Sequence, residues 1–220
     1  MSVFRHLTEK PWLAPSTVAG LAPAGGAVPS RRAPDVGLNF FFAVVSVLFF
    51  MLIVAYAGRM AFEDWRPAPP PSLLWQNTIV LILASVAMEW ARYSAVRDRL
   101  DGVKLGLFAG GILTAAFMTG QVIAWRELNA MTAFDATNPA VAFFYMITGL
   151  HAAHIAGGLV AWVRVLNRLW RGAETGAIRH GVELCTRYWH FLLIVWLVLF
   201  GLLFSGNDNL NILLTICGIR

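Results

Sequence analysis

The chain has 220 residues, of which 58% are hydrophobic and 13% charged. Soluble globular domains carry about 25% charged residues, so this composition excludes an ordinary soluble protein and indicates one that lies in a lipid bilayer. The net charge of +5 does not indicate a nucleic-acid partner, because the basic residues lie between apolar runs, where they set membrane topology.

The two ends of the chain differ from its middle. Residues 1–35 are rich in Pro, Gly and Ala and contain no sustained apolar run. Nothing in them resembles a cleavable signal peptide, so we expect a flexible cytoplasmic tail and a first apolar run that acts as its own insertion signal. Residues 207–220 include LNILLTICGI, which is too short to cross a bilayer and is expected to form a short external tail at the interface.

Five apolar runs lie between these tails, and each is long enough to cross a bilayer, which takes roughly 20 apolar residues. Polar loops separate them, among them RMAFEDWRPAPPPS, whose proline run excludes a helix. The sequence therefore predicts an all-α, polytopic integral membrane protein with a bundle of five transmembrane helices. The predicted spans are residues 36–58, 72–91, 105–125, 139–163 and 183–206.

Lys and Arg residues lie mostly on one side of these spans. Loops rich in Lys and Arg stay in the cytoplasm, so the N-terminus is expected to be cytoplasmic and the C-terminus periplasmic. Of the 17 basic residues, the only ones on the other side are Arg59, Arg66, Arg126 and Arg220.

The apolar stretch FFYMITGLHAAHIAGGLVAW carries two histidines at membrane depth, where ionisable residues are costly and indicate function by default. At 100° per residue, His151 and His154 share one helix face. Gly149, Ala153 and Gly157 form a ridge of small residues on roughly the opposite face, and such ridges allow tight helix packing. We expect the histidines to be buried polar contacts; a polar site for lipid headgroups, water or protons is the alternative.

The spacing of these two histidines argues against a redox site. Bis-histidine haem needs an imidazole on each side of the iron, and the remaining span histidine, His190, lies near the cytoplasmic boundary. A metal site needs three or four ligands, and no carboxylate or cysteine completes one. We expect no metal or cofactor on this chain and no catalytic residue, since nucleophile-elbow, phosphate-loop and HExxH motifs are missing from the sequence.

A second polar group marks the entry of the last span. Glu183, Arg187 and His190 fall at i, i+4 and i+7 and form one stripe. Trp189 beside them is expected to be an interfacial anchor. The stripe is either a surface ion pair or a pocket for a phospholipid headgroup.

Glu89, near the end of the second span, is the other carboxylate at a membrane boundary. Arg92 follows it at i+3, so we expect an ion pair at the interface. A contribution to a headgroup site is the alternative for both residues.

Two stretches resemble a known family. FFYMITGLHAAHIAGG, residues 143–158, is similar to the helix of haem-copper oxidase subunit III that carries the signature F-F/Y-x-x-T-G-x-H-x-x-H. ELCTRYWHFLLIVWLVLFGLLF, residues 183–204, resembles the last helix of that subunit, with its acidic start and YWHF core. NTIVLILASVAMEWARYS and GQVIAWREL are more weakly similar. With five spans, the chain resembles the short five-helix form of the cytochrome c oxidase subunit III family.

The resemblance implies a non-catalytic subunit of a bacterial terminal oxidase in the inner (plasma) membrane. Haem and copper would then lie in the catalytic subunit I, with subunit II beside it, and this chain would hold structural phospholipid and support proton uptake, oxygen reduction and aerobic respiration. The chain departs from the family in VVSVLFF, which places Ser46 or Val47 where the first helix of family members often carries a carboxylate.

Two alternative interpretations of the sequence remain. One is the equivalent subunit of a quinol oxidase or nitric oxide reductase. Another, of a different class, is a free-standing membrane proton channel or transporter. The sequence contains no internal repeat and no broken span, and span amides such as Asn39 and Gln121 are few, which argues against a transporter.

Overall fold

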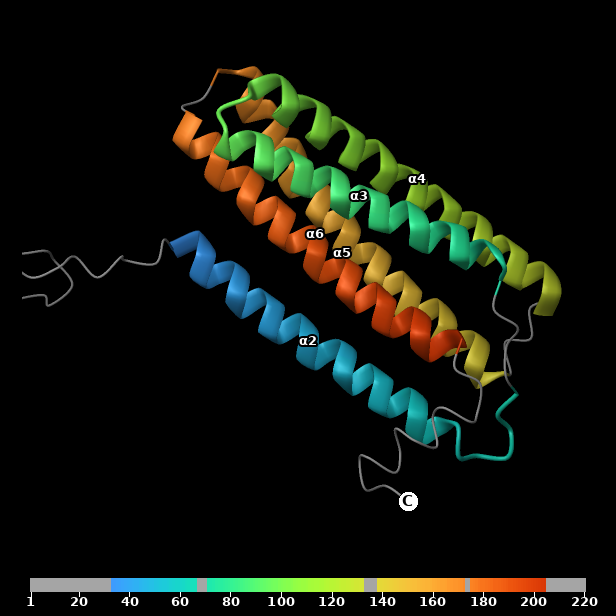
Figure 1. The fold of residues 1–220 in the computed structure, drawn as a ribbon. Coiled ribbons are helices and arrows are strands. Elements are labelled where there is room, and N and C mark those ends of the chain that lie inside the picture. The colour runs from blue at the N-terminus through green and yellow to red at the C-terminus, as the bar shows by residue number, and fades with distance from the viewer. Residues whose placement is uncertain (1–32, 67–70, 133–137, 173–174, 205–220) are drawn as a thin grey trace, which may run out of the picture. The chain divides into compact units, whose positions relative to one another are not determined.

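The computed structural model describes residues 33–66, 71–132, 138–172 and 175–204, so the predicted C-terminal tail and most of the predicted N-terminal tail lie outside the described residues. Within them the chain forms five helices and no strand (Figure 1). All five are long and apolar enough to cross a membrane, which confirms the predicted all-α, multi-pass fold. The helices are α2 (Ala33–Arg59), α3 (Leu73–Val96), α4 (Leu100–Thr132), α5 (Pro139–Trp170) and α6 (Thr175–Phe204).

The last three helices are longer than the apolar runs that predicted them. They have 33, 32 and 30 residues, which is about 45–50 Å, whereas the hydrocarbon core of a bilayer is about 30 Å thick. Apolar runs end where charges begin, but a helix continues through good helix formers such as Arg and Leu. The extra turns of α5 and α6 carry Arg164, Arg168 and Arg179, and we call this end of the bundle the arginine-rich end.

Local sequence signals explain where two of the connections begin and end. The Asn138 side-chain oxygen accepts a hydrogen bond from the Ala140 N–H at 3.0 Å. Pro139 follows this cap in the first turn of α5, where a backbone N–H has no helical partner. Between α3 and α4 the chain turns through Asp98 at φ 55°, a left-handed conformation that Asp adopts more readily than most residues.

Helices α3 and α4 form a close antiparallel hairpin. A Cβ added at Gly106 of α4 would lie 2.7 Å from the backbone nitrogen of Ala91 and 2.8 Å from the carbonyl oxygen of Ala87, so only glycine fits there. Helix α6 lies against α3 and α5. The four helices α3–α6 thus form one bundle, and the side chains of Trp189 and Trp196 are buried inside it.

Three tryptophans join the helices of this bundle. Each indole N–H donates to a threonine hydroxyl on another helix at 2.9–3.0 Å, and each threonine donates to the carbonyl one turn before it at 2.7–2.8 Å. Each hydroxyl is therefore donor and acceptor at once, which leaves neither polar hydrogen unpaired in apolar surroundings. The pairs are Trp125 (α4) with Thr148 (α5), Trp189 (α6) with Thr114 (α4), and Trp196 (α6) with Thr78 (α3).

Helix α2 lies beside α5 and α6 (Figure 1) and is attached to them differently. Its contacts are largely between apolar side chains and rings, such as the stacked pair Phe42 and Phe191 with centroids 4.3 Å apart. An ion pair at its first turn joins Asp35 to Arg187 of α6 at 3.4 Å. Much of the rest of α2 faces outward, and Phe40 is 72% exposed.

Candidate functional site

His151 lies inside the bundle and is completely buried. Its ring packs against Trp196, with centroids 5.1 Å apart, and meets Phe117 edge-on at 6.2 Å. Neither ring nitrogen has a hydrogen-bond partner among the described residues. The sequence predicted a buried polar contact at this position. The side chain is buried, but no described residue forms a hydrogen bond with it.

His154, one turn further along α5, faces α2 and is half-buried. Its Nδ1 lies 2.8 Å from the carbonyl oxygen of Leu150, so Nδ1 carries a hydrogen and donates to that carbonyl. Phe49 of α2 packs against the ring with centroids 5.5 Å apart. In the part of the chain that the structure describes, no three His, Cys, Asp or Glu side chains are grouped to hold a metal ion.

Two buried amides accompany His151. Gln121 of α4 is completely buried, and neither its side-chain oxygen nor its nitrogen is paired within the described ranges. Asn77 of α3 is 4% exposed, and its Nδ2 is likewise unpaired there. Gln121 was expected inside its span, whereas Asn77 was not noted, although the predicted span 72–91 contains it. A polar residue inside an apolar span is the signal that could have identified Asn77.

The polar stripe predicted at the start of the last span does not form one site. Arg187 donates to Glu183 at 2.6 Å and also approaches Asp35 of α2 at 3.4 Å. Two carboxylates therefore share its charge, which leaves little of that charge for a lipid headgroup. His190, the third member of the stripe, contacts α3 instead.

His190 belongs to a cluster between α6 and α3. Its Nε2 lies 3.1 Å from a carboxylate oxygen of Glu89, and its Nδ1 lies 2.5 Å from the hydroxyl oxygen of Ser85. Because Nε2 faces a carboxylate, it carries a hydrogen and donates to Glu89. Glu89 also accepts from Arg92 at 3.0 Å, so the i+3 ion pair expected from the sequence is present. The contact of Ser85 with His190 could not be predicted from the sequence, because the two residues lie 105 positions apart.

Trp189 is not an interfacial anchor, and that prediction was wrong. Its side chain is 1% exposed, and its indole N–H donates to Thr114 inside the bundle at 2.9 Å. Tryptophan is common both at membrane interfaces and in protein interiors that offer its N–H a partner. A position near a membrane boundary therefore does not decide which way the indole points.

Among the described residues, the small-residue ridge predicted on α5 does not pack against another helix. Ala153 and Gly157 are exposed, no atom of another side chain lies within 4 Å of a Cβ added at Gly157, and at Gly149 the nearest such atom is 4.0 Å away. The close approach occurs at Gly158, where a Cβ would lie 2.5 Å from the ring of Tyr188. Small residues permit close packing, but they do not specify which helix will use it.

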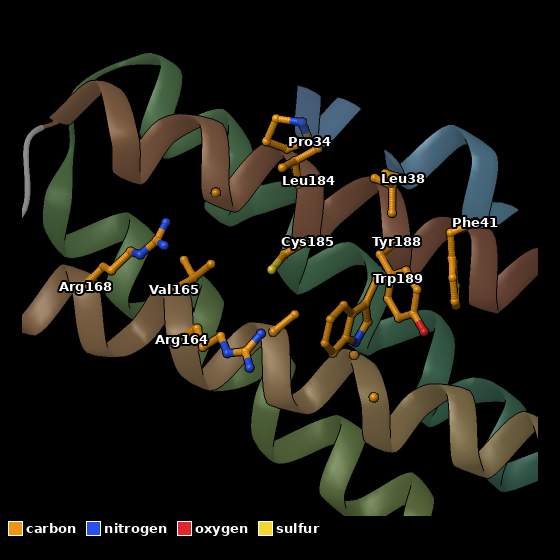
Figure 2. A pocket seen from close by; sticks show the side chains of 14 residues that line it. Pro34, Leu38, Phe41, Arg164, Val165, Arg168, Leu184, Cys185, Tyr188 and Trp189 are labelled. Atoms are coloured by element: carbon orange, nitrogen blue, oxygen red, sulfur yellow. The ribbon is translucent and has the colours of Figure 1, made fainter. Parts of the chain in front are cut away.

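A cavity of about 490 Å³ lies between α2, α5 and α6 at the arginine-rich end (Figure 2). Its walls are mainly apolar and include Leu38 and Leu184. Arg164 and Arg168, one turn apart on α5, border it, and no carboxylate of the described residues lies within 4.0 Å of either guanidinium. Apolar walls beside two guanidinium groups suit a molecule with an apolar body and an anionic head.

The family model described as "Cytochrome c oxidase subunit III" matches residues 36–206, which reach from the start of α2 past the end of α6. The chain belongs to this family. The cytochrome c oxidase subunit 3 of Synechocystis sp. is 32% identical over 181 residues, which cover 76% of this chain and 73% of the relative. That of Thermostichus vulcanus is 30% identical over 173 residues, with 76% and 85% covered. The probable cytochrome c oxidase subunit 3 of Mycobacterium tuberculosis is 28% identical over 164 residues, with 72% and 81% covered.

In this subunit III chain, the two motifs that suggested the family touch each other. The Tyr188 hydroxyl of the YWHF segment donates to the backbone carbonyl of His154 at 2.7 Å. Ser46 and Val47, where the family carboxylate would fall, are both exposed on α2. The departure from the family pattern therefore changes the outer surface of α2 and not the interior of the bundle.

Proposed function

We propose that this chain is the non-catalytic subunit III of a bacterial haem-copper terminal oxidase of the cytochrome c oxidase type. The match to the family over residues 36–206, which includes all five described helices, carries the proposal. Relatives named for cytochrome c oxidase favour this branch over quinol oxidases and nitric oxide reductases. In this role the chain supports a catalytic subunit I that holds haem and copper, beside subunit II, in proton uptake, oxygen reduction and aerobic respiration.

The proposal places the chain in the bacterial inner membrane with its N-terminus in the cytoplasm and its C-terminus in the periplasm. The distribution of basic residues supports this orientation, because loops rich in Lys and Arg stay in the cytoplasm. Four basic residues surround the α3–α4 turn, whereas the loops at the other end of the helices carry few. The residues at that turn are Arg92, Arg97, Arg99 and Lys104.

Purification of the tagged chain from its own membranes in a mild detergent tests the assembly. We expect a larger subunit with a haem-copper optical spectrum to co-purify, and we expect the same chain expressed alone to show no haem spectrum. A chain that purifies without any haem protein, or that shows a haem spectrum by itself, would contradict the proposal. Oxygen consumption with reduced cytochrome c or with quinol then identifies the electron donor of the complex.

The cavity beside Arg164 and Arg168 suits the phospholipid expected from the sequence better than the stripe of Glu183, Arg187 and His190 does. We propose that an anionic phospholipid places its phosphate near these two guanidinium groups and its acyl chains along the apolar walls. The volume of about 490 Å³ lies within the range of roughly 300–1,000 Å³ found for ligand pockets. Arg187 serves this purpose less well because two carboxylates already neutralise it.

Mass spectrometry of co-purified phospholipid distinguishes the two sites. The double variant Arg164→Gln/Arg168→Gln should lose a tightly bound anionic phospholipid that the wild type retains. The matched variant Arg187→Gln removes one guanidinium from the same end of the bundle and should retain the lipid. Loss of the lipid in Arg187→Gln but not in the double variant would instead place the headgroup at the predicted stripe. Unchanged lipid in both variants would mean that neither site holds it.

A further inference from the structure

Three polar side chains with unpaired atoms lie in the interior of the bundle. Asn77 of α3 is 4% exposed, and Gln121 of α4 and His151 of α5 are 0% exposed. Among the described residues, no hydrogen-bond partner exists for Nδ2 of Asn77, for either amide atom of Gln121, or for either ring nitrogen of His151. Buried polar groups are almost always paired with protein or with ordered water, and the cost of leaving one unpaired is greatest at membrane depth.

The face of α4 that carries Gln121 packs against α5 around His151. Phe117, Gln121 and Trp125 follow one another at i, i+4 and i+8 and share one face of α4. Phe117 contacts the His151 ring, with centroids 6.2 Å apart. Trp125 donates to Thr148, one turn before His151, at 2.9 Å. Since its two neighbours on α4 contact α5 at these levels, Gln121 lies between the levels of Thr148 and His151.

Asn77 reaches the same region from α3. Its side-chain oxygen lies 2.0 Å from the position that a Cβ would take at Gly120, so the amide lies against α4 at the residue that precedes Gln121. The next residue on α3, Thr78, accepts from Trp196, whose ring packs against His151 at 5.1 Å. These contacts of α3, α4 and α5 bring Asn77, Gln121 and His151 to neighbouring levels in the interior of the bundle.

The neighbouring hydroxyl groups have no hydrogen left for this region. Thr78 donates to the carbonyl of Leu74 at 2.8 Å, and Thr148 donates to that of Phe144 at 2.7 Å. The side-chain oxygen of Gln121 and the unprotonated nitrogen of a neutral His151 are both acceptors that need a donor. Water offers two donors and two acceptors, and buried waters commonly make about three hydrogen bonds to such groups.

We propose that Asn77, Gln121 and His151 bind a buried water in the interior of the bundle. The water donates to the Gln121 side-chain oxygen and to the unprotonated nitrogen of His151, and it accepts from the amide hydrogens of Asn77. It supplies a hydrogen-bond donor to one ring nitrogen of His151 and joins α3, α4 and α5 through one molecule. The inference rests on side chains of this chain alone, so it holds or fails independently of the proposed oxidase role.

A cryo-electron microscopy map of the purified wild-type assembly, at a resolution that shows ordered water, tests the site directly. We expect a separate density peak about 2.6–3.2 Å from polar atoms of at least two of the three side chains. Direct contact between Gln121 and His151 with no separate peak would overturn the proposal, and so would an empty region.

Variants give a second, independent measurement. Gln121→Met, which keeps the size of the side chain but removes its polar atoms, should abolish the peak and shorten the thermal inactivation half-life about three- to tenfold. His151→Phe added to it should lengthen the half-life again, because the polar groups are then removed together. Thr119→Val on the exposed face of α4 is the control and should change neither measurement. A density peak that remains in Gln121→Met would contradict the shared site. A half-life that is shorter in the double variant than in Gln121→Met alone would contradict it as well.

Discussion

Helices α3–α6 and helix α2 are held by different kinds of contact. The four-helix bundle is joined by three Trp–Thr hydrogen bonds and by a glycine that brings two backbones together at Gly106. α2 rests on α5 and α6 through apolar and aromatic side chains, with a partly exposed ion pair at Asp35. Both regions are made of apolar helices, so the difference lies in the residues that face the neighbours and not in overall hydrophobicity.

This difference matters because apolar surface alone does not drive helices together in a membrane. Lipid tails are as apolar as leucine side chains, so association depends on close packing, hydrogen bonds and small residues. The bundle α3–α6 has these features, whereas α2 contacts its neighbours largely through apolar and aromatic side chains such as Phe42. We infer that the bundle forms by its own contacts, while the position of α2 depends more on the lipid or protein that covers its outer face.

The largest expected effect comes from truncating the same residue type in the two regions. Phe117→Ala removes a completely buried ring that packs against Trp196 at 5.0 Å and against His151. It should destabilise the purified chain by about 3–5 kcal/mol, because a cavity remains in the bundle. Phe40→Ala, which truncates a ring that is 72% exposed on α2, should change the stability by no more than about 0.5 kcal/mol.

Thermal unfolding in detergent, followed by circular dichroism, measures both variants under the same conditions. Equal losses for the two variants would show that α2 is as much a part of the stable core as α4. In the assembled complex, a new loss for Phe40→Ala alone would identify the outer face of α2 as covered by a partner.

The sequence predicted the helices well because their signal is local. Each span is a continuous apolar run, and Asn138 followed by Pro139 marks the start of α5 in the residues themselves. The motif around His151 and His154 identified the family for a similar reason, since residue types at fixed spacing can be recognised without knowing their contacts. The lengths of α4–α6 were underestimated because a hydropathy pattern ends before the helix does.

Orientation of side chains was the part that could not be predicted. Trp189 was expected at the interface and is buried, whereas Gly157 was expected in a packed ridge and is exposed. In a soluble helix the polar face indicates the outside, but in these helices both faces are apolar, so the pattern does not say which one meets a neighbour. Asn77, Gln121 and His151 come from three helices, and no spacing along the chain indicates that they share the buried water proposed above.

A pair of glycine substitutions tests the packing with a smaller expected effect. Gly106→Ala places a methyl group against the backbone of α3, so the two helices must separate, and we expect a loss of about 1–3 kcal/mol. Gly157→Ala meets no atom of another side chain within 4 Å, and alanine is a better helix former than glycine by about 1 kcal/mol. It should leave the stability unchanged or raise it slightly. A loss for Gly157→Ala in the isolated chain, measured by thermal unfolding, would restore the ridge as a packing surface.

The smallest expected effect concerns the ion pair that joins α2 to the bundle. Asp35→Asn removes a carboxylate from Arg187, which keeps its contact with Glu183 at 2.6 Å. Partly exposed pairs of this kind contribute about 0–1 kcal/mol, so the unfolding midpoint of the chain should hardly move. The distance distribution between spin labels on α2 and α6 should nevertheless broaden at the arginine-rich end. The wild-type distribution should also broaden at high salt, where exposed charges are screened.

Glu183→Gln is the control, because it breaks a pair within α6 alone, and it should leave the distance distribution narrow. Equal broadening in both variants would mean that Arg187 itself, and not its bond to Asp35, positions α2.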